Sequence, residues 1–165
     1  MLCLHKFPIT LIMLLTLGAV LTQAHGQEDK PLLERDQFSI GIGISDNEIS
    51  SSSNSDTDTG FQFFAAYDLN QVNLMEGVNS SVEFGFMDFG FDNDDTGIWA
   101  SYVVDGTISG RLGWIAQAGL DIGDDSGLLF GAGLKFMPQD KSDLRFEYVK
   151  RDEVDSLQIN YLYHL

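Results

Sequence analysis

The sequence predicts an all-β fold: an eight-stranded antiparallel up-and-down transmembrane β-barrel with short turns, preceded by a cleaved signal peptide. Three observations lead to this prediction. An apolar N-terminal stretch ends in small residues, the rest of the chain alternates between apolar and polar residues, and the polar positions combine glycine with opposite charges. No later window holds the unbroken apolar run of about 18 residues that a transmembrane helix needs.

Composition narrows the class of function. The 165 residues suit one domain, and 9 Lys and Arg against 25 Asp and Glu give a net charge of -16. Nucleic-acid binding requires a basic surface that neutralises phosphates, so we predict no nucleic-acid partner. The sole cysteine, Cys3, lies in the N-terminal segment. We therefore expect neither disulfides nor a cysteine metal site in the mature chain.

The N-terminus has the pattern of a secretory signal peptide. A weakly basic start precedes the apolar stretch 7–21, and small residues follow it. We predict cleavage after Ala24, with cleavage after Gly26 as the alternative. The apolar stretch is short for an uncleaved membrane anchor. The predicted organisation is therefore a signal peptide over 1–24, an N-terminal tail over 25–36 and a barrel domain over 37–165.

Eight segments alternate between apolar and polar residues with the period of two that a β-strand requires. The first is typical, because Phe38, Ile40 and Ile42 alternate with serine and glycine. The fourth is the least regular, because Trp99 and Val103 fall on its polar face. In chain order, the predicted strands are residues 37–45, 61–69, 82–87, 98–104, 108–122, 129–136, 144–149 and 157–165.

The other strands are assigned from their apolar faces in the same way. These faces comprise Phe61, Phe63, Ala65 and Tyr67 in the second strand; Val82, Phe84 and Phe86 in the third; Leu112, Trp114, Ala116, Ala118 and Leu120 in the fifth; Phe130, Ala132, Leu134 and Phe136 in the sixth; Leu144, Phe146 and Tyr148 in the seventh; Leu157, Ile159, Tyr161 and Tyr163 in the eighth.

A soluble barrel would turn these apolar faces inward, so alternation alone leaves two arrangements open. Strand length, the glycine and charge content of the polar face, and aromatic residues near the strand ends favour apolar faces directed at lipid. With both termini in the periplasm, the predicted outer connections are 46–59, 90–96, 123–126 and 151–155. The predicted inner connections are 70–79, 105–107 and 137–142; the first of them is long for an inner turn.

Charged residues of both signs share the predicted lumen. An eight-stranded barrel has room for side chains but not for a column of water, so buried charges must pair. We predict a structural plug of salt bridges, with a gated ion path as the alternative. The predicted network consists of Asp68, Glu83, Arg111, Asp121, Lys135, Arg145 and Glu147.

The sequence offers no catalytic set. Ser156 lies near the predicted outer rim beside Asp155, but the mature histidines, His25 and His164, fall in the N-terminal tail and at the opposite rim. A serine nucleophile needs an adjacent base. We therefore predict that the protein is not an enzyme.

All four predicted outer connections carry acidic residues. The segment 92–97 resembles the start of a calcium loop, but Val103 stands where an EF-hand has its bidentate glutamate. Clustered carboxylates at a membrane raise the local concentration of divalent cations. We predict no dedicated cofactor, but weak binding of Ca²⁺ or Mg²⁺ that bridges to anionic lipopolysaccharide, with solvated loops as the alternative. The residues assigned to it are Asp92, Asp94, Asp95, Asp152, Glu153 and Asp155.

The segments GLDIGDDSGLLFGAGLKF and LRFEYVKRDEVDSLQINYLYHL resemble the small outer-membrane β-barrel proteins related to the OmpA transmembrane domain and OmpX. The terminal alternation of Tyr161, Tyr163 and Leu165 resembles the end signal that the outer-membrane assembly machinery reads, although that signal normally ends in phenylalanine. The resemblance implies a Gram-negative outer-membrane location and contact with lipid, lipopolysaccharide, periplasmic chaperones and the assembly machinery. It implies no particular activity.

Together, these observations predict a monomeric outer-membrane barrel with a structural or surface-interaction role, in envelope integrity, adhesion or lipopolysaccharide contact. Two alternatives remain open: a narrow porin-like channel, and a soluble periplasmic ligand-binding barrel.

Overall fold

The computed structural model describes residues 34–50, 55–69, 75–91, 96–123 and 126–165. The chain divides into two units, Met1–Leu33 and Glu34–Leu165, and all described residues belong to the second. The predicted signal peptide, 1–24, lies outside the described residues. In the part that is described, no helix has the length and apolar character needed to cross a membrane.

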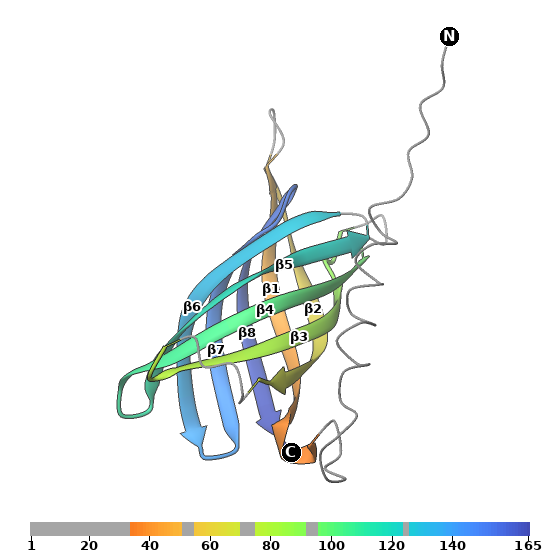
Figure 1. Ribbon diagram of the computed structural model, residues 1–165. Coiled ribbons are helices and arrows are strands. Elements are labelled where there is room, and N and C mark those ends of the chain that lie inside the picture. The colour runs from red at the N-terminus through yellow and green to blue at the C-terminus, as the bar shows by residue number, and fades with distance from the viewer. Residues whose placement is uncertain (1–33, 51–54, 70–74, 92–95, 124–125) are drawn as a thin grey trace, which may run out of the picture. The chain divides into compact units, whose positions relative to one another are not determined.

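The second unit is a closed barrel of eight strands, each antiparallel to its neighbours (Figure 1). A short 3₁₀ turn, Arg35–Gln37, precedes the first strand. The strands are β1 (Phe38–Ser50), β2 (Ser55–Asp68), β3 (Val78–Asp88), β4 (Thr96–Ser109), β5 (Leu112–Gly123), β6 (Gly127–Gln139), β7 (Ser142–Lys150) and β8 (Val154–His164). The predicted all-β, up-and-down, eight-stranded fold is confirmed.

The barrel closes where β1 pairs with β8. Ile42 of β1 pairs with Phe63 of β2 on one side and with Tyr161 of β8 on the other. Because side chains alternate between the two faces of a strand, all three project from the same face. The terminal N–H of Leu165 donates a 3.0 Å hydrogen bond to the carbonyl of Phe38 and completes the closure.

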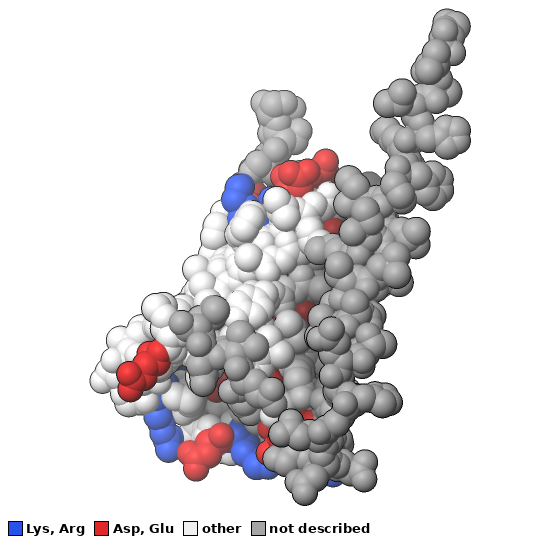
Figure 2. Space-filling model, viewed as in Figure 1, with Lys and Arg blue, Asp and Glu red and all other residues white. Residues whose placement is uncertain are grey.

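The barrel has two ends, which we name from the chain. The terminal rim carries the start of β1, the end of β8 and the connections β2–β3, β4–β5 and β6–β7. The loop rim carries the other four connections. Figure 2 shows uncharged residues between the two rims on the face in view, with charged residues gathered at both ends.

Several strands extend further than predicted. β1 continues to Ser50 and β2 starts at Ser55, so most of the predicted outer connection 46–59 is a paired hairpin. Backbone pairing continues there without apolar alternation, which is why the residue pattern did not reveal it. The predicted inner turn 105–107 is also wrong, because β4 runs on to Ser109 and the turn follows at Gly110.

Gly106 explains this second error. This glycine lies inside β4, where the indole of Trp114 on β5 fills the space that a side chain of Gly106 would take. An aromatic ring that covers a glycine on the neighbouring strand allows the glycine to remain inside a sheet. Gly110, with φ +56°, provides the left-handed conformation at the actual reversal.

Candidate functional site

The lumen is the part of the molecule where polar chemistry concentrates, and an ion pair lies near its middle. Arg145 on β7 donates to Glu83 on β3 across the barrel, with 2.6 Å between Nη1 and Oε1. The two side chains are 6% and 3% exposed. The two charges therefore stabilise each other strongly, because little solvent reaches either of them.

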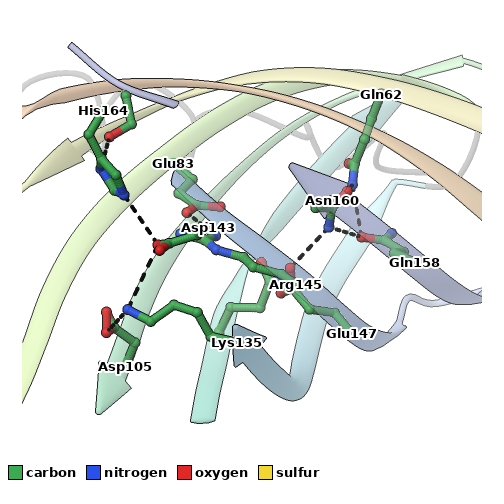
Figure 3. A network of polar contacts seen from close by, with 12 residues as sticks. Gln62, Glu83, Asp105, Lys135, Asp143, Arg145, Glu147, Gln158, Asn160 and His164 are labelled. Atoms are coloured by element: carbon green, nitrogen blue, oxygen red, sulfur yellow. Dashed lines mark hydrogen bonds and ion pairs between the residues drawn. The ribbon is translucent and has the colours of Figure 1, made fainter. Parts of the chain in front are cut away.

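A cluster of amides adjoins this pair (Figure 3). The Nε2 of Gln62 on β2 donates to Gln158 at 2.9 Å and to Asn160 at 2.6 Å, both on β8. The Nδ2 of Asn160 and the Nε2 of Gln117 each donate to Glu147 at 2.9 Å. The cluster thus links strands far apart in the chain and holds the Glu147 carboxylate in the lumen.

Little space remains between these side chains. The cavity that they line with Phe64, Trp99 and Leu129 has a volume of about 10 Å³, close to the lower limit for a single water molecule. The lumen is therefore filled by side chains at this level, as a plug would be, and not by a column of water.

A second set of charges lies toward the terminal rim. Lys135 on β6 forms ion pairs with Asp105 on β4 and, at 3.8 Å, with Asp143 on β7. His164 Nε2 lies 3.3 Å from Asp143, and its Nδ1 lies 2.7 Å from the hydroxyl of Ser39 (Figure 3). A polar cavity of about 270 Å³ is lined by Lys135, Asp143 and His164 among others.

The order serine, histidine, aspartate in this set is that of a hydrolase triad, but the geometry argues against catalysis. Ser39 is only 1% exposed, so a substrate cannot reach its hydroxyl, and it contacts Nδ1 of His164, not Nε2. Ser156, considered from the sequence, is also buried, and its hydroxyl accepts a hydrogen bond from Arg151. The Ser39–His164 and Arg151–Ser156 contacts therefore have a structural role, because they link separate parts of the barrel wall.

A third set of charges closes the lumen toward the loop rim. The Nε of Arg151 donates to Asp121 at 2.8 Å, and its guanidinium lies 5.3 Å from the ring centroid of Phe89. Phe89 and Met87 are fully buried beneath it. Arg151, which the sequence placed in an outer connection, thus points inward as the partner of Asp121.

The structure brings most of the predicted lumen charges together. Five of them are buried: Glu83, Asp121, Lys135, Arg145 and Glu147. Asp68 lines the cavity at the terminal rim. The assignment of Arg111 is wrong: it is exposed on the β4–β5 turn, where it donates to the carbonyl of Pro138 at 2.7 Å. The alternation was extended across a chain reversal that the sequence did not reveal.

Sequence reasoning missed three charged members of the interior. Asp105 lies in the predicted inner turn 105–107, and Asp143 lies just outside the predicted strand 144–149. Correct strand ends place both of them in the lumen by parity. Arg151 follows the last residue of β7 and has no periodic pattern that would direct it inward.

The residues predicted to bind divalent ions are only partly described. Asp92, Asp94 and Asp95 lie outside the described residues. Asp152 and Glu153 are exposed between β7 and β8. Asp155 accepts hydrogen bonds from Lys150 at 3.0 Å and Tyr148 at 2.8 Å. In the ranges described, no three acidic, histidine or cysteine side chains are grouped as a metal site would require.

The residues of the predicted assembly signal lie on and just after β8. Tyr161 and Tyr163 project outward and are exposed, and Leu165 lies beside the start of β1. Their recognition by the assembly machinery stays a prediction.

Comparison with known proteins supports the architecture. No family model matches the chain, and no curated protein matches it. A solved structure from the de novo design of transmembrane β-barrels is similar, with 16% identity and a TM-score of 0.54 over 84% of this chain and 100% of that one.

Two natural proteins are similar at the same level. Ail, the attachment invasion locus protein of Yersinia pestis, has 18% identity and a TM-score of 0.53 over 79% of this chain and 99% of that one. Neisserial surface protein A has 12% identity and a TM-score of 0.50 over 78% and 97%. At these identities the likeness concerns the fold alone: this chain has the closed eight-stranded barrel architecture of small transmembrane β-barrels.

Proposed function

We propose that this chain is an integral β-barrel of the Gram-negative outer membrane, akin to the OmpA transmembrane domain and OmpX. In this proposal it is a monomer with its terminal rim toward the periplasm and serves a structural or surface-interaction role, not a catalytic one. The observation that carries it is the inverted distribution of side chains. Apolar side chains cover the outside, whereas ion pairs and amides fill the inside.

The apolar exterior argues against the soluble alternative. Ile40, Ile42 and Ile44 of β1 are 55–57% exposed, and Phe63 and Phe84 on the next two strands are exposed to a similar extent. A contiguous apolar surface of this kind is rare on a soluble monomer and marks a membrane or protein contact. The plugged lumen also leaves little space for a ligand at its centre.

The first test concerns location. We expect the mature protein in the outer-membrane fraction, extracted only by detergent, with a gel mobility that shifts on boiling because the closed barrel resists unfolding. A periplasmic protein without a membrane anchor, followed in the same fractions, is the control. Recovery of this chain in the soluble periplasm without detergent would refute the membrane proposal.

A second test separates the proposal from the channel alternative. Because the Glu83–Arg145 pair and the amide cluster fill the lumen, we expect purified barrels in planar lipid bilayers to give no stepwise conductance. A porin of known conductance, inserted in the same bilayer, controls for insertion. Discrete current steps from this chain would favour a narrow channel.

The loop rim is the surface that we propose for interaction. Asp46, Glu48 and Asp58 are exposed on the β1–β2 hairpin, and Asp152 and Glu153 are exposed between β7 and β8. Function on a rigid scaffold commonly lies on its connections. Divalent cations can bridge such carboxylates to the phosphates of lipopolysaccharide, since both are hard oxygen ligands.

We expect amide substitutions of the acidic residues assigned to ion binding to weaken calcium-dependent retention on immobilised lipopolysaccharide while the barrel stays folded. The substituted residues are Asp92, Asp94, Asp95, Asp152, Glu153 and Asp155. Asp155→Asn alone measures the effect of breaking the contact with Lys150. Glu76→Gln with Asp140→Asn at the terminal rim is the control for lost negative charge. Equal retention of all variants, or retention that a chelator does not affect, would contradict the proposed ion bridge.

A further inference from the structure

An apolar hollow lies on the outer face of the barrel over β8, β1, β2 and β3. These four strands are consecutive neighbours in the closed sheet (Figure 1). Its volume is about 610 Å³, and its lining is almost entirely apolar. It is therefore a recess within the exposed apolar surface, separate from the polar lumen described above.

The register of the strands explains the hollow. Ala65 on β2 pairs with Ile40 of β1 and with Phe84 of β3. Phe63 and Tyr67 lie two residues before and after it, on the same face of β2. A single methyl group is thus surrounded by four bulky side chains, and the recess lies over this small residue.

The floor of the hollow is closed from within. The ring of Phe64, which points into the lumen, occupies the space where a side chain of Gly41 would lie. Trp99 occupies the corresponding space at Gly85, and the two rings lie 5.6 Å apart. Any occupant of the hollow must therefore enter from outside the barrel, where the membrane would be.

We propose that the hollow holds one acyl chain of a phospholipid. This inference rests on the membrane location proposed above, because hydrocarbon chains would then surround the apolar exterior. If the recess is empty, the side chains along its walls lack the van der Waals contacts that an occupant would provide. A linear, flexible chain can enter a recess one side chain wide, whereas the convex wall of another barrel is much broader.

The depth of the hollow in the proposed membrane orientation indicates which lipids can reach it. Ile40 is two residues from the start of β1, and its partner Tyr163 is one residue from the end of β8. Ile42, in the middle of the apolar band of β1, also lines the hollow, so the hollow extends from the middle of the band toward the terminal rim. In the proposed orientation, the phospholipids of the periplasmic leaflet reach this depth. Lys141 is exposed on the adjoining β6–β7 turn, after Asp140, and its carbonyl accepts a 3.0 Å hydrogen bond from His164 N–H. Its ammonium is available to a lipid phosphate.

The experiment replaces two outward alanines with phenylalanine, one at a time. Lipid binding is measured by native mass spectrometry of barrels released from vesicles of phosphatidylethanolamine and phosphatidylglycerol. Ala65→Phe places a ring in the hollow and obstructs it, whereas Ala132→Phe changes an outward alanine on β6 and is the matched control. We expect the wild type and Ala132→Phe to retain one phospholipid. The affinity of Ala65→Phe for that phospholipid should be lower by about tenfold. Lys141→Gln should weaken retention, unlike Lys150→Gln at the opposite rim.

Equal lipid retention by Ala65→Phe and Ala132→Phe would overturn the inference. A wild-type dimer that carries no lipid and dissociates on Ala65→Phe would also overturn it, because a second copy would then cover the hollow. Ala65→Leu replaces Ala65→Phe if the larger side chain prevents folding. Boiling-dependent gel mobility of the same samples tests insertion separately, so a failure of the membrane proposal is distinguishable.

Discussion

Replacing Glu83 with alanine is expected to lower the free energy of unfolding by about 3–5 kcal/mol, because it leaves the Arg145 guanidinium buried without its partner. The pair has a 2.6 Å contact and side chains that are almost fully buried, so water cannot replace the lost carboxylate. The measurement is urea unfolding of the barrel in lipid vesicles.

A double-mutant cycle provides the control. Arg145→Met removes the opposite charge, and the variant with both substitutions removes the pair. Since neither charge then remains unpaired, the double variant should be less destabilised than the sum of the two single changes. Additive losses of stability would show that Glu83 and Arg145 act independently, which would contradict the structural role assigned to their contact.

Replacing Ile42 with arginine is expected to destabilise the barrel by about 2–4 kcal/mol in a bilayer. Ile42 projects outward between Phe63 and Tyr161, in the middle of the apolar band of β1, where the guanidinium would face hydrocarbon. Ile108→Arg is the matched control, because Ile108 is also exposed but lies at the end of β4 beside the terminal rim. Near the membrane–water interface, the loss of unfolding free energy should fall to about 0–1 kcal/mol.

Unfolding of both arginine variants in urea, in vesicles of one lipid, measures this depth dependence. Equal small losses at both positions would mean that the apolar faces do not contact lipid, and the membrane proposal would fail. Equal large losses would instead mean that Ile108 also lies at membrane depth and that the band is wider than β1 suggests.

The strands were predictable because each has one apolar face and one polar face over the same stretch. Parity placed Glu83 and Arg145 in the lumen correctly, although their contact could not be foreseen without the strand order around the barrel. Even Trp99, an apolar residue on the polar face of its strand, lies inside as parity requires and packs on Phe64. Buried aromatic rings are part of the plug.

Other features had no signal in the residue pattern. The polar ends of β1 and β2 are held by backbone pairing alone, so hydropathy could not detect them. Arg111 was misplaced because the reversal at Gly110 interrupts the alternation. Arg151, which follows β7, turns inward toward Asp121 on β5, a contact that depends on tertiary structure and not on local sequence.

The cross-barrel plug also has a consequence for how the chain assembles. Glu83 and Arg145 come from β3 and β7, and Gln62 and Asn160 come from β2 and β8, so their partners are supplied only when the ends of the sheet have met. An open sheet in hydrocarbon would expose these groups together with its two unpaired edges. Partly closed intermediates are therefore disfavoured, and insertion should be a concerted, all-or-none event in which β1 meets β8 as the interior bonds form.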